Sequence, residues 1–346
     1  MRLKPDTING LANGVYSALA MLAAMQLDVF TPLGQGPKTA EDIAAALGLD
    51  TTKLSPLLYA LVTTGLLAMD GERFANSAES DHFLVSGKRS YIGGLHEAYS
   101  DLWSAALRTA ESIRTGVPQA MHDFSAMAEE ELRAFLRGLD PGAVAAAKSL
   151  ARHFDFAGYA TLIDLAAGSG GLAMELCRRF PGLVATAVDL PNVAAITKGF
   201  VAEAGLEDRI VVQACDVVAA APAGVFDVAV LRSFLQVIPP DAARLAVIHT
   251  GEALRPGGDI YIVGRVLDDT RLGPPETVAF NVVFLSVYDG GQAHTEGRHR
   301  QWLKEAGFID ITRKQLAGGY SVIQARKRPI GRRAGAGVPS PERGFT

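Results

Sequence analysis

Residues 161–171, which read TLIDLAAGSGG, decide the fold of this chain. The short apolar run indicates a buried strand, and the small residues after it form a strand-to-helix turn where backbone can approach a ligand closely. Four more apolar runs follow, separated by stretches with helical periodicity: residues 183–190, 209–216, 226–233 and 259–266. Alternating strands and helices predict an α/β fold with a parallel, doubly wound sheet.

The ends of the first three predicted strands carry groups that suit a nucleoside, and an open α/β sheet binds ligands at that edge. Asp189 follows the second strand, where its carboxylate can accept hydrogen bonds from both ribose hydroxyls of an adenosine group. Asp216 follows the third strand, where it can accept from the adenine amine. A nicotinamide cofactor is the competing interpretation, but the run Gly168-Ser169-Gly170-Gly171 lacks the last glycine of the GxGxxG pattern.

The first third of the chain predicts a winged helix. Thr39 is typical of a helix start, Gly48 of a helix end, and Thr51 or Thr52 can cap the next helix. The segment 67–74 predicts a β-hairpin around Asp-Gly. The helical periodicity covers residues 14–30, 39–49 and 51–69.

A winged helix raises the alternative of DNA binding, and charge argues against it. Residues 38–82 hold three basic and seven acidic side chains, and the whole chain has a net charge of −4, the wrong sign for neutralising phosphates. No nucleic-acid partner is expected. The helix that precedes this region is apolar over most of its surface, from Val15 to Leu27, and predicts a subunit contact and hence a homodimer.

The length of 346 residues predicts more than one domain. We expect a winged-helix dimerisation domain over residues 1–88, linking helices that contribute to the acceptor pocket over 89–156, and the cofactor-binding domain over 157–328. Residues 329–346 are basic, hold Gly and Pro and lack apolar periodicity, so we expect a disordered tail there.

Composition indicates a folded cytoplasmic protein, with 49% hydrophobic and 20% charged residues. No continuous apolar run has the length of a membrane span, and the N-terminus lacks the pattern of a signal peptide, so no membrane partner is expected. Cys177 and Cys215 lie in apolar segments and are expected to be buried thiols rather than a disulfide or a metal pair.

These motifs resemble the bacterial and plant O-methyltransferase family, which joins a winged-helix dimerisation domain to a class I, Rossmann-like methyltransferase domain. The resemblance covers nearly the whole chain, including GPKTAEDIAAALGLD, LIDLAAGSGG, FPGLVATAVDLP, the turn LRPGG and GGQAHTEGRHRQWLKEAGF. It implies S-adenosyl-L-methionine as cofactor, S-adenosyl-L-homocysteine as product and a small-molecule acceptor. The cofactor residues that it implies are Asp164, Gly168 and Gly170 at the methionine part, Asp189 and Leu190 at the ribose, and Asp216 and Val217 at the adenine, with Arg232 where the family usually has a lysine. The family's DxGGGxG pattern is altered here by Ala166 and Ala167.

One departure from the family changes the expected chemistry. Members that methylate hydroxyls carry a histidine base in the segment L-H-D-W, where this chain has Leu235-Gln236-Val237-Ile238. An amide cannot take the proton of a hydroxyl. A thioether sulfur has a lone pair and no proton to lose, so it needs only positioning. The favoured hypothesis is therefore S-methylation of a thioether acid, as in the methylthiohydroxybutyrate S-methyltransferases of dimethylsulfoniopropionate synthesis.

Two other hypotheses stay open. One is C- or O-methylation of a 2-oxo acid or an aromatic hydroxyl through another base or a metal. The other is a cofactor-binding protein without methyl transfer.

The acceptor pocket is expected to take side chains from the linking helices and from the region after residue 266. His294 and His299 are the histidines expected near this face; a shared metal is the alternative to a hydrogen-bonding His294 and a surface His299, and no metal site is predicted. Phe280 and Phe284 are expected in the core. The pocket candidates are His96, Tyr99, Trp103, Gln236, Asn281, Tyr288 and His294.

Overall fold

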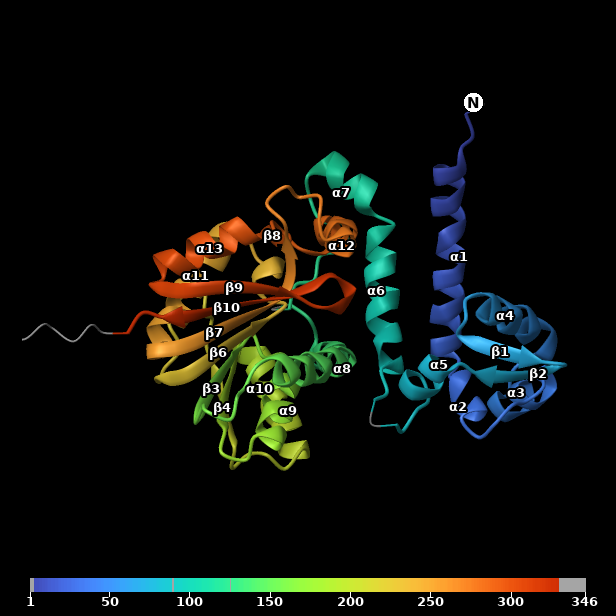
Figure 1. The fold of residues 1–346 in the computed structure, drawn as a ribbon, viewed down its shortest axis with the longest axis horizontal. Coiled ribbons are helices and arrows are strands. Elements are labelled where there is room, and N and C mark those ends of the chain that lie inside the picture. The colour runs from blue at the N-terminus through green and yellow to red at the C-terminus, as the bar shows by residue number, and fades with distance from the viewer. Residues whose placement is uncertain (1–2, 89, 125, 330–346) are drawn as a thin grey trace, which may run out of the picture.

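The computed structural model describes residues 3–88, 90–124 and 126–329. A small N-terminal unit and a larger α/β unit lie on either side of the helix α6 (His96–Ala106), as Figure 1 shows. The N-terminal unit contains α1 (Asp6–Gln26), α2 (Phe30–Leu33), α3 (Ala40–Leu47), α4 (Thr51–Thr63), β1 (Leu67–Asp70), β2 (Arg73–Asn76) and α5 (Ala78–Phe83).

The local signals of this unit agree with the sequence prediction in all but one detail. Thr39 caps α3 in a capping box with Asp42, and Gly48 ends that helix at a φ of 67°. Strands β1 and β2 pair antiparallel as the predicted hairpin. The expectation that Thr51 or Thr52 caps α4 was wrong, because Asp50 accepts the hydrogen bond from the Lys53 backbone N–H.

The predicted strands are all present in one sheet of the larger unit. They are β3 (Thr161–Leu165), β4 (Val184–Asp189), β5 (Ile210–Ala214), β6 (Phe226–Arg232) and β7 (Leu254–Leu267). The strand order is β5-β4-β3-β6-β7-β10-β9, with β8 (His294–Thr295) beside β7. Strands β9 (Phe308–Gln315) and β10 (Tyr320–Lys327) run antiparallel, so the sheet is mixed rather than wholly parallel. The chain reverses through a short turn, η3 (Ala317–Gly319), and needs no crossover helix there.

Both faces of the sheet are covered, as the doubly wound prediction requires. Leu162 points into one core with α8 (Glu129–His153), while its neighbour Ile163 points into the other with α11 (Pro240–Ala253). The first face is completed by α9 (Gly171–Arg179) and α10 (Pro191–Glu203), and the second by α13 (Glu296–Glu305).

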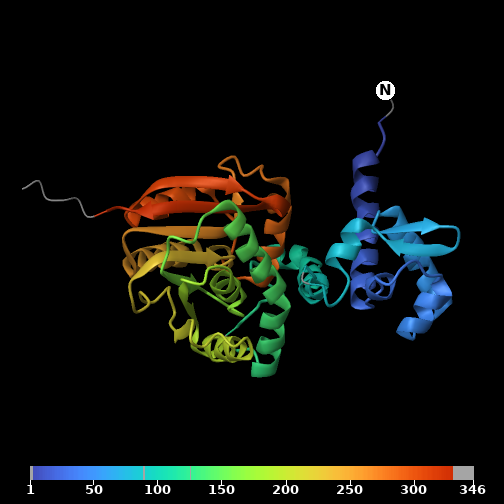
Figure 2. The same ribbon diagram turned by 60° about the horizontal axis from the view of Figure 1, so that its bottom comes forward.

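The linking helices join the two units and wall the carboxyl edge of the sheet. Helix α6 follows η1 (Gly93–Leu95) and contacts α1 on one side and α8 and α12 (Pro275–Val287) on the other. Figure 2 shows α6 between the N-terminal unit and the sheet, with the long α8 crossing beside it. Helix α7 (Thr109–Thr115) packs on α12.

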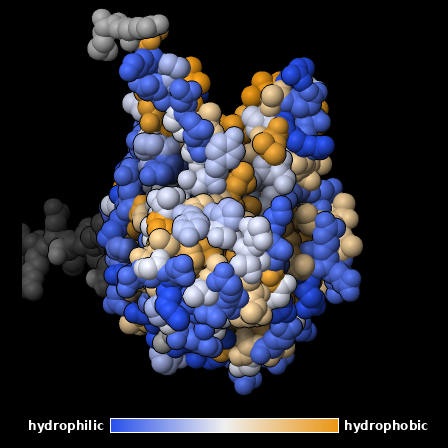
Figure 3. Space-filling view, turned by 90° about the vertical axis from the view of Figure 1, so that its right-hand side faces the viewer, coloured by the Kyte–Doolittle hydropathy of each residue, from blue (hydrophilic) through white to orange (hydrophobic). Residues whose placement is uncertain are grey.

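Helix α1 projects from the N-terminal unit (Figure 1), and several of its apolar side chains are exposed. The space-filling view in Figure 3 shows orange apolar side chains on this projection, and the exposed ones are Ile8, Leu11, Val15, Tyr16 and Leu19. By length and composition α1 could cross a membrane, with 21 residues and a hydropathy of 1.3. Helix α1 contains no continuous apolar run of this length. Its average over a window is high because Ala and Met lie between its larger apolar residues. The expected tail from residue 330 onward lies outside the described residues.

Candidate active site

A cavity of about 640 Å³ opens at the carboxyl ends of β3, β4, β5 and β6. Its walls come from the sheet edge, from α6, from the segment between α7 and α8, from α8 itself and from α12. Among the described residues, none before Ala98 lines it, so the N-terminal unit of the same chain takes no part in the walls.

The glycine-rich turn is held in place from two sides. Asp189 accepts a hydrogen bond from the Gly168 N–H at 2.8 Å with one carboxylate oxygen and from the Leu190 N–H at 2.8 Å with the other. Thr197 donates its hydroxyl hydrogen to the Gly168 carbonyl at 2.6 Å. Three residues of the turn have positive φ, namely Ala166 at 54°, Gly168 at 57° and Gly170 at 75°. The turn is therefore shaped by the protein before any ligand binds.

Two opposite charges are buried beneath this turn. Asp164 is 1% exposed, and its Oδ2 has no hydrogen-bond partner among the described residues. Burial raises the pKa of Asp164 to about 7, although the nearby Arg232 guanidinium opposes the rise. Burial also lowers the pKa of Arg232. A buried carboxylate oxygen without a donor is costly, so this atom is left without the donor that its burial calls for.

The other two strand ends face the same cavity. Asp216 accepts from the Val218 N–H at 2.9 Å and lines the cavity. Burial raises the pKa of Asp189 to about 6, against the two N–H donors that lower it. Of the expected cofactor residues, Asp164 and Gly170 lie behind the wall, and the lining ones are Gly168, Asp189, Leu190, Asp216, Val217 and Arg232. Cys177 is buried, whereas Cys215 is partly exposed on the cavity wall.

Gln236, at the position of the family's base, forms a side-chain hydrogen bond with the backbone. It lies in η2 (Leu235–Val237) after β6, is 7% exposed, and its Oε1 accepts from the Arg265 N–H of β7 at 2.7 Å. That bond assigns the oxygen of the amide, so the Nε2 group is a donor at the cavity wall. Gln236 can hold a ligand oxygen here but cannot take a proton from it.

The expected acceptor residues separate into three places. Gln236 and Tyr288 line the large cavity. Asn281 and His294 line a smaller cavity of about 200 Å³ beside it. His96, Tyr99 and Trp103 lie on α6 but line neither cavity, and Tyr99 stacks on Trp103 with ring centroids 5.8 Å apart. Phe280 and Phe284, expected only in the core, also border the large cavity.

His294 and His299 form a buried aromatic group with Trp302. His294 bonds the Leu235 carbonyl at 3.0 Å, and His299 bonds the Thr295 carbonyl at 2.9 Å. The expectation of a surface His299 was wrong, because its residue is 3% exposed against Trp302. Burial lowers the pKa of each histidine to about 4, so both are neutral at pH 7. Across the described ranges, no group of three metal-ligating side chains is present.

A histidine that the sequence did not single out lies in the large cavity. His122, between α7 and α8, places Nε2 at 2.9 Å from Oδ2 of Asp101 on α6, and both residues line the cavity. The ring of His122 packs against Phe124, Phe135 and Tyr288. No motif links positions 101 and 122, because each lies on a different segment and only the packing of α6 against α12 brings them together.

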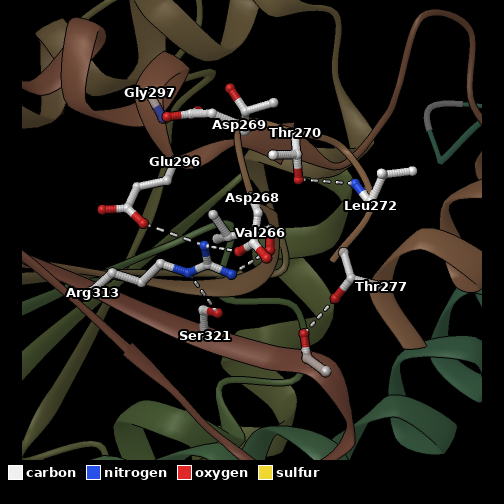
Figure 4. Close-up of polar contacts among 12 residues, drawn as sticks. Val266, Asp268, Asp269, Thr270, Leu272, Thr277, Glu296, Gly297, Arg313 and Ser321 are labelled. Carbon is white, nitrogen blue, oxygen red and sulfur yellow. Dashed lines mark hydrogen bonds and ion pairs between the residues drawn. The ribbon is translucent and has the colours of Figure 1, made fainter. Parts of the chain in front are cut away.

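A polar network holds the loop between β7 and α12, which positions the aromatic wall. Arg313 of β9 bonds Asp268 at 2.7 Å, Glu296 at 3.3 Å and the Val266 carbonyl at 2.8 Å. Figure 4 shows Arg313 at the centre of these groups, with Thr277 at the start of α12 bonded separately to the chain near β10. Because the Arg313 side chain is only 7% exposed, this network is a buried support for the acceptor side.

Two family models match the chain, one in each unit. A family model described as an O-methyltransferase domain matches residues 108–309, and one described as an O-methyltransferase dimerisation domain matches residues 9–86. The 3-hydroxy-5-methyl-1-naphthoate 3-O-methyltransferase of Streptomyces sahachiroi is 30% identical, over 93% of this chain and 95% of that protein. The tetracenomycin polyketide synthesis 8-O-methyl transferase of Streptomyces glaucescens is 28% identical, over 93% of this chain and 97% of that protein.

A solved structure shows the same fold. The crystal structure of human N-acetylserotonin methyltransferase in complex with SAM superposes with a TM-score of 0.81 at 24% identity, covering 95% of this chain and 99% of that one. The N-terminal helical unit and the Rossmann-like sheet therefore have the arrangement of a class I methyltransferase with its partner domain.

Proposed function

Because the chain belongs to the O-methyltransferase family, we propose that it transfers the methyl group of S-adenosylmethionine to a hydroxyl of a small aromatic acceptor. The observation that carries this proposal is the cavity of about 640 Å³, in which the strand-end carboxylates adjoin an aromatic wall. Its volume lies in the usual range of small-molecule sites, about 300–1,000 Å³.

The strand ends fit the cofactor. The partnerless Oδ2 of Asp164 suits the cationic amino group of the methionine part, and Arg232 suits its carboxylate. Asp189 and Asp216 remain the residues for the ribose hydroxyls and the adenine amine. When bound, the cofactor supplies an electrophilic methyl group on a sulfonium sulfur. A nearby ammonium would favour the charged form of Asp164, whose pKa burial has raised to about 7.

The aromatic wall favours a flat acceptor. Phe124, Phe135, Phe284 and Tyr288 line the cavity. Such rings stabilise an aromatic ligand by burial and by edge or offset contacts, each worth about 0.5–1.5 kcal/mol beyond buried area. Two relatives named above are 3-O- and 8-O-methyl transferases, which agrees with a hydroxyl acceptor on a fused ring.

S-methylation of a thioether acid, as in dimethylsulfoniopropionate synthesis, is the second candidate. Gln236 favours it, since no proton acceptor stands at the family's base position. The charge of the cavity argues against this second candidate. The carboxylates Asp101, Asp123 and Asp289 line the acceptor side, and Arg232 is the only lysine or arginine among the described lining residues. A small carboxylate acceptor would meet repulsion there.

We also propose that the protein is a cytoplasmic homodimer. The dimerisation-domain match begins within α1, whose exposed apolar face needs a cover. A second copy of this chain supplies that cover in water, and the membrane alternative for α1 then falls away. Light scattering of the purified protein should give about twice the 36.5 kDa of one chain.

The proposal is tested by measuring S-adenosylhomocysteine release with several acceptors in parallel. We would offer 2-naphthol, catechol, 4-methylthio-2-hydroxybutyrate, methionine and a 2-oxo acid. We expect turnover of a phenol and no turnover of the thioethers. Turnover of a thioether alone would overturn the proposal in favour of S-methylation, and cofactor binding in calorimetry without turnover of any acceptor would indicate a binding protein.

A further inference from the structure

We propose that His122, oriented by Asp101, is the general base that removes the proton of the acceptor hydroxyl. The inference rests on the proposed O-methylation. His122 can take a proton, which Gln236 cannot do. The base would then lie on the linking segments instead of on the loop after β6.

The geometry of the pair sets the tautomer of the ring. Nε2 of His122 lies 2.9 Å from Asp101 Oδ2, so the carboxylate accepts the Nε2 hydrogen and leaves the lone pair on Nδ1. That Nδ1 atom is buried and has no hydrogen-bond partner among the described residues. A carboxylate that orients a neutral imidazole and stabilises its protonated form is the arrangement that makes histidine an effective base.

The ring is fixed in place by its surroundings. Its side chain is 8% exposed and packs against Phe135 with centroids 5.4 Å apart and against Tyr288 at 5.8 Å. The backbone N–H of His122 donates to the Val287 carbonyl at 3.0 Å, which ties the segment to the end of α12. Asn192 of α10 donates to the Phe124 carbonyl at 2.6 Å, so the same segment is also tied to the cofactor side.

A buried nitrogen lone pair without a donor is a cost that a ligand donor would remove. The surrounding rings belong to the wall proposed for the aromatic acceptor, so the hydroxyl of a ring stacked there is the donor of suitable chemistry. An ordinary structural histidine bonds through both nitrogens or to backbone, as His294 does with the Leu235 carbonyl. His122 instead keeps one nitrogen without a partner among the described residues, on a ring that borders the cavity.

Titratable groups face His122 from several elements. Asp101 faces it from α6, Tyr288 from the end of α12, and Asp123 and Asp289 line the same cavity. Burial raises the pKa of Tyr288, with Asp101 adding to the rise, so its hydroxyl stays neutral and does not compete as a base. The side chain of Asp101 is 45% exposed, which gives the transferred proton a route to solvent.

The step balances without a further reagent. The acceptor O–H bond breaks and its proton moves to Nδ1 of His122. The oxygen electron pair forms the new O–CH₃ bond, and the pair of the broken S–C bond stays on sulfur, which leaves a neutral thioether. The imidazolium then loses its proton to water.

The test compares acceptors of different acidity in the full-length enzyme. His122→Phe keeps a ring among the aromatic side chains and removes the base. With 2-naphthol, which is un-ionised near pH 7, we expect kcat to fall about 100-fold or more, since a positioned base typically contributes about 10²–10⁴-fold. With 4-nitrophenol, which is largely ionised at pH 8, we expect a loss of less than about 10-fold, because no proton remains to be removed.

The pH profile and two further variants separate catalysis from structure. The wild-type rate with 2-naphthol should fall at acid pH. The rate of His122→Phe should not show this fall. Asp101→Asn should lower kcat about 10-fold with little change in KM, as expected for a positioning residue. His153→Gln, on the exposed end of α8, is the matched control and should leave all rates unchanged.

The outcomes distinguish the two levels of inference. Equal losses with both phenols, or an unchanged pH profile in His122→Phe, would overturn the base while leaving O-methylation intact. A wild-type enzyme that methylates no phenol would overturn the proposed function and this inference with it. Calorimetry with S-adenosylmethionine should give wild-type affinity for His122→Phe, which excludes misfolding as the cause of a loss.

Discussion

The two halves of the cavity are built in different ways. The cofactor half comes from three strand ends that lie close in the sheet, and backbone N–H groups already hold its turn through Asp189. The acceptor half comes from α6, the segment before α8, and α12, which are far apart in the chain and held by side-chain networks such as that of Arg313. Local sequence motifs form the cofactor half, whereas the acceptor half depends on which distant segments pack together.

The largest expected effect tests whether the acceptor half depends on its buried support. Arg313→Met removes a guanidinium that bonds Asp268, Glu296 and the Val266 carbonyl. Losing these hydrogen bonds of a charged group should cost about 3 kcal/mol of unfolding free energy in total, because the two carboxylates left behind are partly exposed. Urea denaturation measures the loss. The matched control Arg244→Met breaks the exposed pair with Glu305 and should leave the unfolding free energy nearly unchanged. Similar costs for the two would contradict a supporting role for the network.

Acid should weaken the acceptor side through its buried histidines. The pKa of His299 lies at about 4 in the folded protein against 6.5 for a free histidine, because burial disfavours its charge. The unfolded chain therefore binds more protons, and stability that is complete above pH 6.5 is lost as pH falls toward 4, by about 3 kcal/mol for this residue. His299→Phe should show a smaller loss of unfolding free energy between pH 7 and 4. Parallel pH curves for the two proteins would rule out this origin.

In the cofactor half the dependence of stability on pH has the opposite sign. Burial raises the pKa of Asp189 to about 6 and that of Asp164 to about 7, so the folded protein without ligand binds protons there more tightly than the unfolded chain. These carboxylates stabilise the fold less as pH rises from about 4 through 6 or 7. At neutral pH the buried charges of these carboxylates therefore lower the stability of the ligand-free protein, and a bound cationic group would offset that cost.

Asp189→Ala tests the cofactor half directly. In the proposed site the substitution removes two charge-assisted hydrogen bonds to the ribose, and it also removes the bond that holds Gly168. The expected loss is about 3 kcal/mol, or about 150-fold in affinity for S-adenosylmethionine. Calorimetry measures the dissociation constant. Asp208→Ala, an exposed carboxylate before β5, should leave it unchanged. Unaltered affinity in Asp189→Ala would remove this residue from the cofactor site.

The smallest effect concerns the alanine in the turn. Ala166 has a φ of 54°, where an L-residue other than glycine costs about 1–2 kcal/mol. Ala166→Gly removes that cost and adds about 0.5–1 kcal/mol of backbone entropy loss, so a net gain of about 0.5–1 kcal/mol is expected. Thermal unfolding should show a small rise in Tm. Ala202→Gly, on the exposed face of α10, should lower it instead.

Local signals predicted most elements correctly. The capping residue Thr39, the end at Gly48, the hairpin and the five parallel strands follow from short-range patterns. The strands β9 and β10 escaped prediction because their alternating and charged residues, such as those of 308–315, lack a continuous apolar run. His299 was wrongly placed at the surface because its burial depends on Trp302 in the same helix packing under β7 and β8.

The sequence by itself determined the fold class and the strand ends at which the proposed cofactor residues lie, because strand periodicity, turn glycines and the acids after them act over a few residues. Only the tertiary structure decided which residues line the acceptor half. It turned Gln236 toward the β7 backbone, moved Tyr99 and Trp103 out of the cavity, and joined His122 to Asp101. Those contacts join segments that are distant in the chain, so their geometry follows from the packing of α6, α8 and α12 and from no local pattern.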